Sequence, residues 1–392
     1  MKKVYLDYAA ATYIDPRVLK KMEPYLEGFF GNPSSLHAAG REARMVMENA
    51  RREVADILGA VKDEIIFTGS GTESDNLAIL GVAENYKKKG KHIIVSKIEH
   101  KAVLEPAKKL ESQGFEVTYL DVDKNGLVKI SELKKFLRKD TILVSIMYAN
   151  NEIGIIQPIG EIAEVIKNFR EKFNSEFPLF HSDACQAAGA LNLKVKNLGV
   201  DLMTFNGSKI YGPKGVGCLY VSKNVELKPL IIGGGQENNL RAGTENAAFI
   251  TGFAEALKLA DKLKEKENPR LKNLRDYFIG KVLRIISHSY LNGDPMKRLP
   301  NNINISIVGI EGEALLLMLD KYGIFASTGS ACVSRSLEPS HVLLAIGVSP
   351  ELAHGSLRVT LGRKTTRKDL DYTLKILGVV VKKLRAISSI KL

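Results

Sequence analysis

The stretch Glu64-Ile65-Ile66-Phe67-Thr68-Gly69-Ser70-Gly71-Thr72-Glu73-Ser74 decides the fold. Its first five residues form a short apolar run that is typical of a buried strand, and a helical pattern from Glu73 to Lys89 follows the glycine-rich turn. A strand that passes through such a turn into a helix is the unit of a parallel α/β sheet. Backbone N–H groups at the helix start favour a phosphate, although the lysine of an ATP-binding P-loop is missing. An ordinary helix cap by Thr72 or Ser74 is the alternative.

The same alternation of strand and helix continues through most of the first 220 residues. Further strands are predicted at Lys91–Ser96, Glu116–Asp121, Thr141–Met147, Leu179–Asp183 and Gly217–Val221. Helices are predicted at Val103–Gln113 and Glu161–Lys172, and earlier in a helix capped by Asp15-Pro16 and a long helix that Gly59 ends. The pattern predicts a large domain with a mainly parallel sheet.

A second, smaller domain is predicted from the composition of the C-terminal part. Residues 254–288 are charged and helical, with an interruption at Asn268-Pro269, and strands follow near Asn302–Ile307 and Leu357–Leu361. We place the boundary near residue 258. Residues 15–258 then form the large domain, whereas residues 1–14 and 259–392 form a small α+β domain.

Composition limits the classes of function. The chain of 392 residues carries 57 Lys and Arg against 44 Asp and Glu, a net charge of +13. These basic residues are scattered, so solvated helix faces are favoured and direct nucleic-acid binding is not expected. The three cysteines, at 185, 218 and 332, form no CxxC pair and fit a reducing compartment. No stretch approaches the roughly 18 to 20 apolar residues of a membrane span, so a cytoplasmic protein is predicted.

Polar clusters follow several of the predicted strands, at the edge where open parallel sheets bind ligands. In Phe180–Gln186, Asp183 ends an apolar strand, where an acid is costly unless it holds a cation or a proton donor such as a pyridinium nitrogen. A metal site made of His181, Asp183 and Cys185 is the alternative, because alternation along a strand puts all three on one face.

Two further clusters carry a lysine and a histidine. Lys209 lies in a glycine-rich turn between two apolar strands, a placement suited to Schiff-base chemistry. His100 follows the strand at Lys91–Ser96 and can stack on a planar ring and move protons. With the Thr72 turn and Asp183, these residues predict a site for pyridoxal 5'-phosphate.

At this point the chain resembles the cysteine desulfurases, in the class-V aminotransferase group of fold-type I pyridoxal-phosphate enzymes. The resemblance covers nearly the whole length, and residues 332–341 look like the cysteine loop of the iron–sulfur-assembly and nitrogen-fixation branch. Its motifs are Tyr5–Ala10, Gly31–Ser35, Thr72–Asn76, Glu99–Lys101, Asn150–Gly154, Asp183–Gln186, Lys209–Gly215, Arg241–Thr244, Ser330–Cys332 and Ser356–Arg358.

The resemblance implies roles for these residues around the cofactor. Lys209 would form the Schiff base and remove the substrate α-proton, and His100 would stack on the ring and transfer protons. Asp183 would hold the pyridine nitrogen and Gln186 the phenolic oxygen. Further cofactor contacts are implied for Gly71, Thr72, Asn151, Asn206, Ser208 and Thr244, the last from the other subunit of a homodimer.

The resemblance also implies how substrate and sulfur are handled. Arg358 would grip the carboxylate of L-cysteine, with Asn151 beside it. Cys332, whose small and polar neighbours are typical of a loop, would attack the substrate sulfur, leaving L-alanine and a persulfide. The sulfur acceptor would be an iron–sulfur scaffold or a tRNA-thiolation enzyme. No resident metal is implied, although Cys332 could share an iron–sulfur cluster during transfer.

Two features depart from the family pattern. Asn206-Gly207-Ser208 replaces the usual Ser-Gly-His before the lysine, but a hydroxyl and an amide can still donate hydrogen bonds to a phosphate. The sequence stops at Leu392, whereas some relatives have a longer tail that contacts the scaffold. The alternatives are a selenocysteine lyase or aminotransferase of the same fold, or a partner protein that has lost catalysis.

Overall fold

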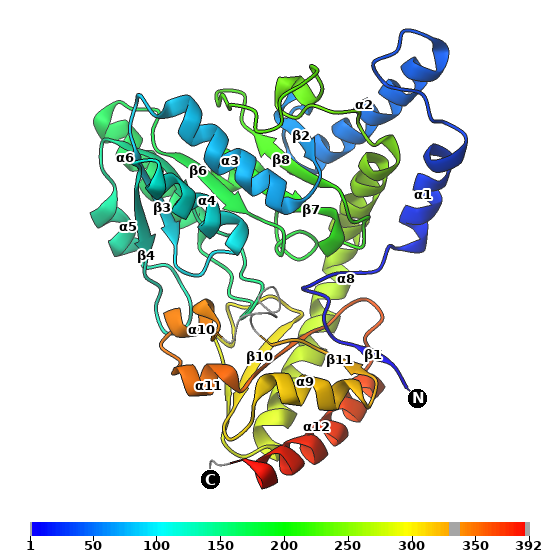
Figure 1. The fold of residues 1–392 in the computed structure, drawn as a ribbon, viewed down its shortest axis with the longest axis vertical. Coiled ribbons are helices and arrows are strands. Elements are labelled where there is room, and N and C mark those ends of the chain that lie inside the picture. The colour runs from blue at the N-terminus through cyan, green and yellow to red at the C-terminus, as the bar shows by residue number, and fades with distance from the viewer. Residues whose placement is uncertain (1, 329–337, 389–392) are drawn as a thin grey trace.

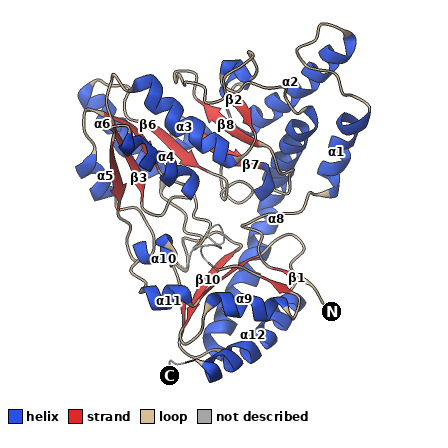
Figure 2. Cartoon of the chain, viewed as in Figure 1, coloured by secondary structure: helices blue, strands red, loops and turns tan. Residues whose placement is uncertain are grey.

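The computed structural model describes residues 2–328 and 338–388. Two layered parts lie one above the other in Figure 1, and the helix α8 (Ala247–Ile285) runs from one into the other. Figure 2 shows a large sheet in the upper part and a small one in the lower part, both packed against helices. None of the helices in the described residues combines the length and apolar character that a membrane crossing requires.

Seven strands form the large sheet in the spatial order β2-β8-β7-β6-β5-β3-β4. Strand β8 (Gly217–Val221) is antiparallel to both neighbours, and the other pairs are parallel. The remaining strands are β2 (Ile65–Thr68), β3 (His92–Ser96), β4 (Glu116–Leu120), β5 (Thr141–Ser145), β6 (Leu179–Asp183) and β7 (Leu202–Asn206). The predicted mainly parallel sheet is confirmed, with strand ends that differ by one or two residues at most.

Local sequence signals set the helix ends. The Asp15 side chain accepts a hydrogen bond from the Arg17 N–H and caps the first helix, and Gly59 ends the second with a φ of 68°. Both ends were predicted. The helices of this part are α1 (Pro16–Glu27), α2 (Ala38–Leu58), α3 (Gly71–Tyr86), α4 (Lys101–Ser112), α5 (Ile130–Phe136), α6 (Ile159–Phe173) and α7 (Val195–Leu198), with single 3-10 turns at Lys62–Glu64, Gly207–Lys209 and Glu237–Asn239.

Helices cover both faces of the large sheet. Ile79 of α3 and Val103 of α4 pack with Ile93 of β3 in the core on one face. Val54 of α2 and Phe253 of α8 belong to the core on the other face. Because apolar side chains fill both faces, polar groups that follow the strands gather at the carboxyl edge of the sheet.

The smaller part is built on an antiparallel sheet in the order β12-β10-β9, with a parallel pair β1-β11 beside it. Both strands that were predicted here, β10 and β12, are confirmed. Its elements are β1 (Val4–Tyr5), β9 (Ser289–Leu291), β10 (Asn302–Ile307), α9 (Gly312–Asp320), β11 (Ile324–Phe325), α10 (His341–Ala345), α11 (Pro350–His354), β12 (Ser356–Thr360) and α12 (Arg367–Ile387).

The predicted helix break at Asn268-Pro269 is wrong. Helix α8 runs through Pro269 for 39 residues. Tertiary contacts offset the hydrogen bond that proline removes, since the Asn268 amide donates to the Ala190 carbonyl at 2.7 Å and Arg270 donates to the Thr365 carbonyl at 2.8 Å. The predicted boundary at residue 258 falls inside this helix, and the division into two domains stays a prediction.

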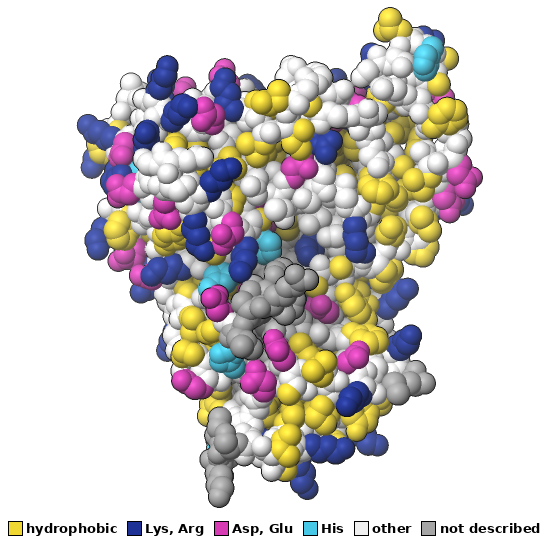
Figure 3. Space-filling model, viewed as in Figure 1, with side chains coloured by type: hydrophobic (Ala, Val, Ile, Leu, Met, Phe, Trp, Pro, Cys, Tyr) yellow, Lys and Arg dark blue, Asp and Glu magenta, His cyan; other side chains and the backbone are white. Residues whose placement is uncertain are grey.

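Charged side chains are interspersed on the surface. On the face shown in Figure 3, lysine and arginine alternate with aspartate and glutamate. Exposed pairs such as Lys97 with Asp121 and Arg138 with Glu116 join opposite charges at 2.5 and 2.6 Å. Such pairs stabilise little and are typical of a solvated surface.

Candidate active site

A cavity of about 280 Å³ opens at the carboxyl edge of the large sheet. Segments that follow β2, β3, β5, β6 and β7 contribute to its walls, as the sequence predicted for polar clusters after strands. The predicted site residues that line it are Gly71, Thr72, His100, Asn151, Asp183, Gln186, Asn206, Lys209 and Arg358. The other lining residues are Ala9, Ala10, Asp75, Met147 and Cys185.

Lys209 reaches the cavity from the 3-10 turn that follows β7. Its Nζ donates hydrogen bonds to the backbone carbonyls of Ala9 and Ala10, at 2.9 and 2.6 Å. The Gln186 amide also donates to the Ala9 carbonyl, at 3.0 Å. Carbonyls from the start of the chain thus fix the position of the lysine amine in the cavity.

The two residues that depart from the family pattern bind each other. Asn206 Oδ1 accepts hydrogen bonds from both the backbone N–H and the hydroxyl of Ser208, each at 3.1 Å. Asn206 therefore caps the turn that carries Lys209. The Ser208 hydroxyl donates to Asn206 and Ser208 does not line the cavity, so its contact with a phosphate stays a prediction.

Gly71 opens helix α3 at a point where a side chain has no room. A Cβ atom there would lie 2.8 Å from Cys185 Sγ and 3.1 Å from Asn206 Cβ. Ser70 caps the helix by accepting from the Glu73 N–H at 3.1 Å. No partner within the described residues is recorded for the N–H groups of Gly71 and Thr72. The start of this 16-residue helix can therefore bind an anion in the cavity.

Asp183 is the last residue of β6 and is only 7% exposed. Its Oδ1 accepts from the Cys185 N–H at 2.8 Å. His181, two residues earlier, bonds through its ring to the hydroxyls of Ser145 and Thr204, and burial lowers its pKa to about 4. The alternative metal site finds no support, because the described residues contain no group of three His, Cys, Asp or Glu side chains arranged to hold a metal.

His100 lines the cavity from the start of α4. It caps α4, and its Nδ1 accepts from the Ala102 N–H at 3.1 Å, so the proton of the neutral ring sits on Nε2. Glu99 beside it is fully buried, and this burial raises the pKa of its carboxyl to about 8. Glu99 Oε1 accepts from Met147 N–H at 2.9 Å, which ties the His100 segment to the end of β5.

Arg358 enters the cavity from the small sheet. Its Nη2 donates to Asp7 Oδ1 at 2.9 Å and its Nη1 donates to the Asn151 carbonyl at 3.3 Å. The Nε atom is buried and has no partner within the described residues. A buried guanidinium with an unused donor is suited to an anionic group such as a carboxylate.

Two predicted residues lie apart from this cavity. Thr244 is exposed and lines a separate hollow of about 220 Å³ with Gly69 and Arg241. Cys332 lies outside the described residues. On either side of that stretch, Ser327 exchanges backbone hydrogen bonds with Arg358, at 3.2 and 2.7 Å, and Ser340 donates its hydroxyl to Glu152 at 2.5 Å. Both described flanks therefore contact residues at or beside the cavity.

Asp75 also lines the cavity, a role that was not predicted. It stands three residues after Thr72, a spacing that places both on one face of a helix, so the signal was present. The carbonyls of Ala9 and Ala10 carry no such signal, because every residue has a backbone carbonyl.

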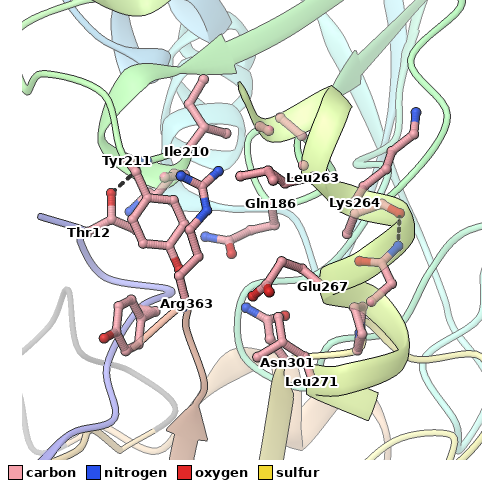
Figure 4. Close-up of a pocket in the computed structure, with 18 of the residues that line it drawn as sticks. Thr12, Gln186, Ile210, Tyr211, Leu263, Lys264, Glu267, Leu271, Asn301 and Arg363 are labelled. Atoms are coloured by element: carbon pink, nitrogen blue, oxygen red, sulfur yellow. Dashed lines mark hydrogen bonds between the residues drawn. The ribbon is translucent and has the colours of Figure 1, made fainter. Parts of the chain in front are cut away.

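A second cavity of about 70 Å³ lies behind Lys209 and shares Cys185, Gln186 and Lys209 with the first. Figure 4 shows Arg363 and Tyr211 on one side of it and Glu267 on the other. Each charged side chain has a partner. Arg363 pairs with Asp15, Glu267 with Arg270 and Lys264 with Asp261. Lys209 donates to the backbone carbonyls of Ala9 and Ala10. These charges are compensated within the protein.

The groups around the larger cavity fit pyridoxal 5'-phosphate. Lys209 offers a primary amine for the aldehyde, and the start of α3 offers N–H groups for the phosphate. Asp183 offers a carboxylate for the pyridine nitrogen. The close approach at Gly71 and the unpartnered Nε of Arg358 show that the walls are shaped and charged for an anionic ligand.

Comparisons with known proteins agree with this geometry. The aminotransferase class-V family matches residues 4–373. The cysteine desulfurase IscS of Dictyoglomus turgidum is 55% identical over 390 residues, which cover 100% of this chain and 97% of that relative. A solved NifS-like protein is 38% identical with a TM-score of 0.91, covering 97% and 100% of the two chains. The structure of SspA in complex with cysteine is 35% identical with a TM-score of 0.79, covering 92% and 99%. The chain therefore belongs to the cysteine desulfurases of the class-V aminotransferase family, which are pyridoxal-phosphate enzymes.

Proposed function

We propose that this chain takes sulfur from L-cysteine, releases L-alanine and carries the sulfur on Cys332 as a persulfide. One observation supports the proposal above the others. A single cavity brings together the amine of Lys209, the carboxylate of Asp183, the ring of His100 and the guanidinium of Arg358. The solved relative bound to cysteine supports the choice of substrate.

In this proposal the cofactor, when bound, supplies an electron sink for bonds broken at the substrate. Lys209 would hold the cofactor and move a proton, because its Nζ stands in the cavity on the carbonyls of Ala9 and Ala10 and is a base once it has lost its proton. His100 donates from Nε2. Asp183, held by the Cys185 N–H, keeps a negative charge for the pyridine nitrogen.

The sulfur step balances without any further reactant. The Cys332 thiolate takes the sulfur atom of L-cysteine, and the carbon that loses the sulfur gains a proton. One L-cysteine and one thiol thus become one L-alanine and one persulfide. Cys332 suits this role by elimination as well, since the thiols of Cys185 and Cys218 are buried and burial raises their pKa.

The experiment that tests this function uses the wild-type holoenzyme. After incubation with L-cysteine and no reductant, we expect one L-alanine for each additional sulfur on the peptide that contains Cys332, detected by mass spectrometry. Absence of alanine would contradict the proposal. Transfer of the amino group to a 2-oxo acid would favour the aminotransferase alternative.

Arg358 is proposed to bind the substrate carboxylate. Replacing it with glutamine removes charge-assisted hydrogen bonds worth about 1.5–3 kcal/mol, so we expect KM for L-cysteine to rise roughly 10- to 150-fold. Steady-state kinetics measure the change. Asp7→Asn is the matched control, because it removes the negative charge of the group 2.9 Å from the guanidinium but keeps the guanidinium, and we expect less than about a fivefold change in KM. Equal effects of the two changes would contradict a direct contact between Arg358 and substrate.

We also propose that the active unit is a homodimer in which Thr244 completes the site of the partner. Its exposure and its position outside the cavity of its own chain support this. Large apolar side chains are exposed as well, among them Phe30 at 86%, Leu36 at 84% and Ile232 at 87%. Exposed apolar surface of this kind favours a protein contact.

A mixed dimer tests the exchange. Lys209→Ala and Thr244→Ala chains each lack one part of the proposed site. In a mixed dimer, the Thr244→Ala chain keeps its lysine and receives an intact threonine from its partner. We therefore expect mixing to restore cofactor binding at one site per dimer, measured by fluorescence titration. If Thr244 served its own chain, mixing would restore nothing.

The sulfur acceptor and the place of action are proposals too. The resemblance to the iron–sulfur-assembly branch favours an iron–sulfur scaffold, with a tRNA-thiolation enzyme as the second candidate. The two described cysteines form no disulfide, which agrees with a reducing, cytoplasmic environment. Transfer of labelled sulfur from the Cys332 persulfide to each purified acceptor distinguishes the two.

A further inference from the structure

A second carboxyl group, which the proposed mechanism does not use, faces the cofactor cavity. Asp75 lies on α3, is 1% exposed and lines the cavity together with Thr72 and Asp183. A fully buried acid is costly unless it is paired or protonated, so its surroundings decide which form it takes.

No cation neutralises Asp75. Its nearest basic group is His181 Nε2, 3.6 Å from Asp75 Oδ1. Both nitrogens of that ring bond to hydroxyls, of Ser145 and Thr204, and burial lowers the His181 pKa to about 4, so the ring is neutral at physiological pH. Within the described residues no lysine or arginine forms an ion pair with Asp75. Asp75 Oδ1 has no hydrogen-bond partner there either.

The other charged groups around Asp75 are acids. Asp183 on β6 and Glu99 after β3 both act on it with the same sign and raise its pKa. The hydroxyl of Thr204 on β7 is a hydrogen-bond donor beside the carboxyl and acts in the opposite direction, but burial and Asp183 are the larger causes. Lys209 and Arg358 line the same cavity, but within the described residues neither forms an ion pair with Asp75 or Asp183. Two buried carboxyl groups that share a site with no cation paired to either resist ionising together, because the second charge meets the first in a low dielectric. One of the pair must hold a proton.

Burial and hydrogen bonding together favour the charge on Asp183 rather than on Asp75, which is 1% exposed against 7% for Asp183. Asp183 Oδ1 accepts from the Cys185 N–H at 2.8 Å, a bond that favours the ionised form. Asp75 Oδ1 accepts none. Burial and the neighbouring Asp183 accordingly raise the pKa of Asp75 well above its ordinary value.

We propose that Asp75 is a positioning residue that holds a proton in the resting enzyme and thereby keeps the negative charge of this acidic cluster on Asp183. The proposal rests on the proposed function, since Asp183 is where that function places the cofactor nitrogen. When Asp75 is neutral, Asp183 carries the negative charge of this pair, and that single charge can bind the single pyridinium nitrogen.

Infrared spectroscopy tests the protonation state directly. A protonated carboxylic acid has a carbonyl stretch that a carboxylate lacks, so we expect such a band at neutral pH and its loss in Asp75→Asn. Glu99→Gln is the matched control, because Glu99 is buried nearby and contributes a separate band that this variant removes. A spectrum in which Asp75→Asn removes no such band would overturn the proposal.

Cofactor affinity provides the second readout. An amide resembles a neutral acid in size and charge, so we expect Asp75→Asn to bind pyridoxal phosphate within about threefold of wild type, whereas Asp183→Asn, which loses a charge-assisted bond, binds at least about tenfold more weakly. Tenfold weaker binding by a folded Asp75→Asn would show that Asp75 carries charge. If Asp75→Asn does not fold, the pH titration is made on a Glu99→Gln, Glu152→Gln protein, which lacks the two other buried acids whose pKa burial raises. A band that persists there well above pH 4 belongs to Asp75, because an ordinary aspartate would lose it near pH 4.

The two proposals fail in different ways. The infrared band can be recorded on the cofactor-free protein. A protein that binds no pyridoxal phosphate but shows the Asp75 band would refute the proposed cofactor site and would still support a protonated Asp75. A protein that binds the cofactor without the band would refute only the role of Asp75.

Discussion

Replacing Lys209 with alanine is expected to abolish covalent binding of pyridoxal phosphate and, with it, the visible absorption of the purified protein. The reason is geometric. Lys209 is the lysine of this turn that lines the cavity, where the carbonyls of Ala9 and Ala10 hold its Nζ at 2.9 and 2.6 Å. Loss of acid–base catalysis alone lowers turnover by roughly 10²–10⁴-fold, and loss of the covalent link adds to this.

The measurement is an absorption spectrum after gel filtration, combined with mass spectrometry after borohydride reduction, which fixes the cofactor to its lysine. Lys214→Ala is the matched control, because Lys214 lies in the same glycine-rich segment but is exposed and does not line the cavity. We expect the control to keep the spectrum of wild type. A Lys209→Ala protein that kept the visible band would refute the site.

Replacing Cys332 with serine is expected to separate cofactor chemistry from sulfur transfer. The described lining of the cavity already carries the groups proposed to bind cofactor and substrate, so the variant should bind pyridoxal phosphate and L-cysteine as wild type does. A hydroxyl cannot accept sulfur to form a persulfide, and we expect L-alanine production to fall by at least about 10³-fold, as on loss of an active-site nucleophile.

Cys218→Ala is the control for this prediction. Cys218 is on β8, between β2 and β7, and its thiol is buried in the core, which raises its pKa, so we expect wild-type persulfide formation. Alanine release and the mass of each cysteine peptide are measured together. Persulfide on Cys185 in the Cys332→Ser protein would show that the buried thiol is the carrier and that Cys332 serves the acceptor.

Much of the fold was predictable because short apolar runs and capping residues determine its strands and helix ends. Each strand of the large sheet that was predicted as an apolar run is present, and the capping signals at Asp15 and Gly59 set helix ends as expected. The break at Pro269 failed for a physical reason. Each half of α8 buries one side in a core, with Phe253 in one core and Phe278 in the other, and this packing outweighs the local preference.

The residues of the candidate site were likewise predictable where the signal is local, and not where it depends on tertiary contacts. Lys209, Asp183 and His100 were predictable because each follows a strand and carries a side chain with distinctive chemistry. The proton on Asp75 was not, because it depends on which neighbours surround a buried acid in three dimensions. Nor was the cradle of Ala9 and Ala10, since a backbone carbonyl has no signature in sequence.

The carbonyls of Ala9 and Ala10 that hold Lys209 have a consequence for the order in which the chain folds. Lys209 is held by Ala9 and Ala10, and Arg358 is held by Asp7, so the pocket draws on both ends of the chain. During synthesis the contacts of Ala9 and Ala10 must wait for residue 209, and the contact of Asp7 must wait for residue 358 to leave the ribosome. The cavity with all these groups in place therefore forms only after nearly the whole chain has been made.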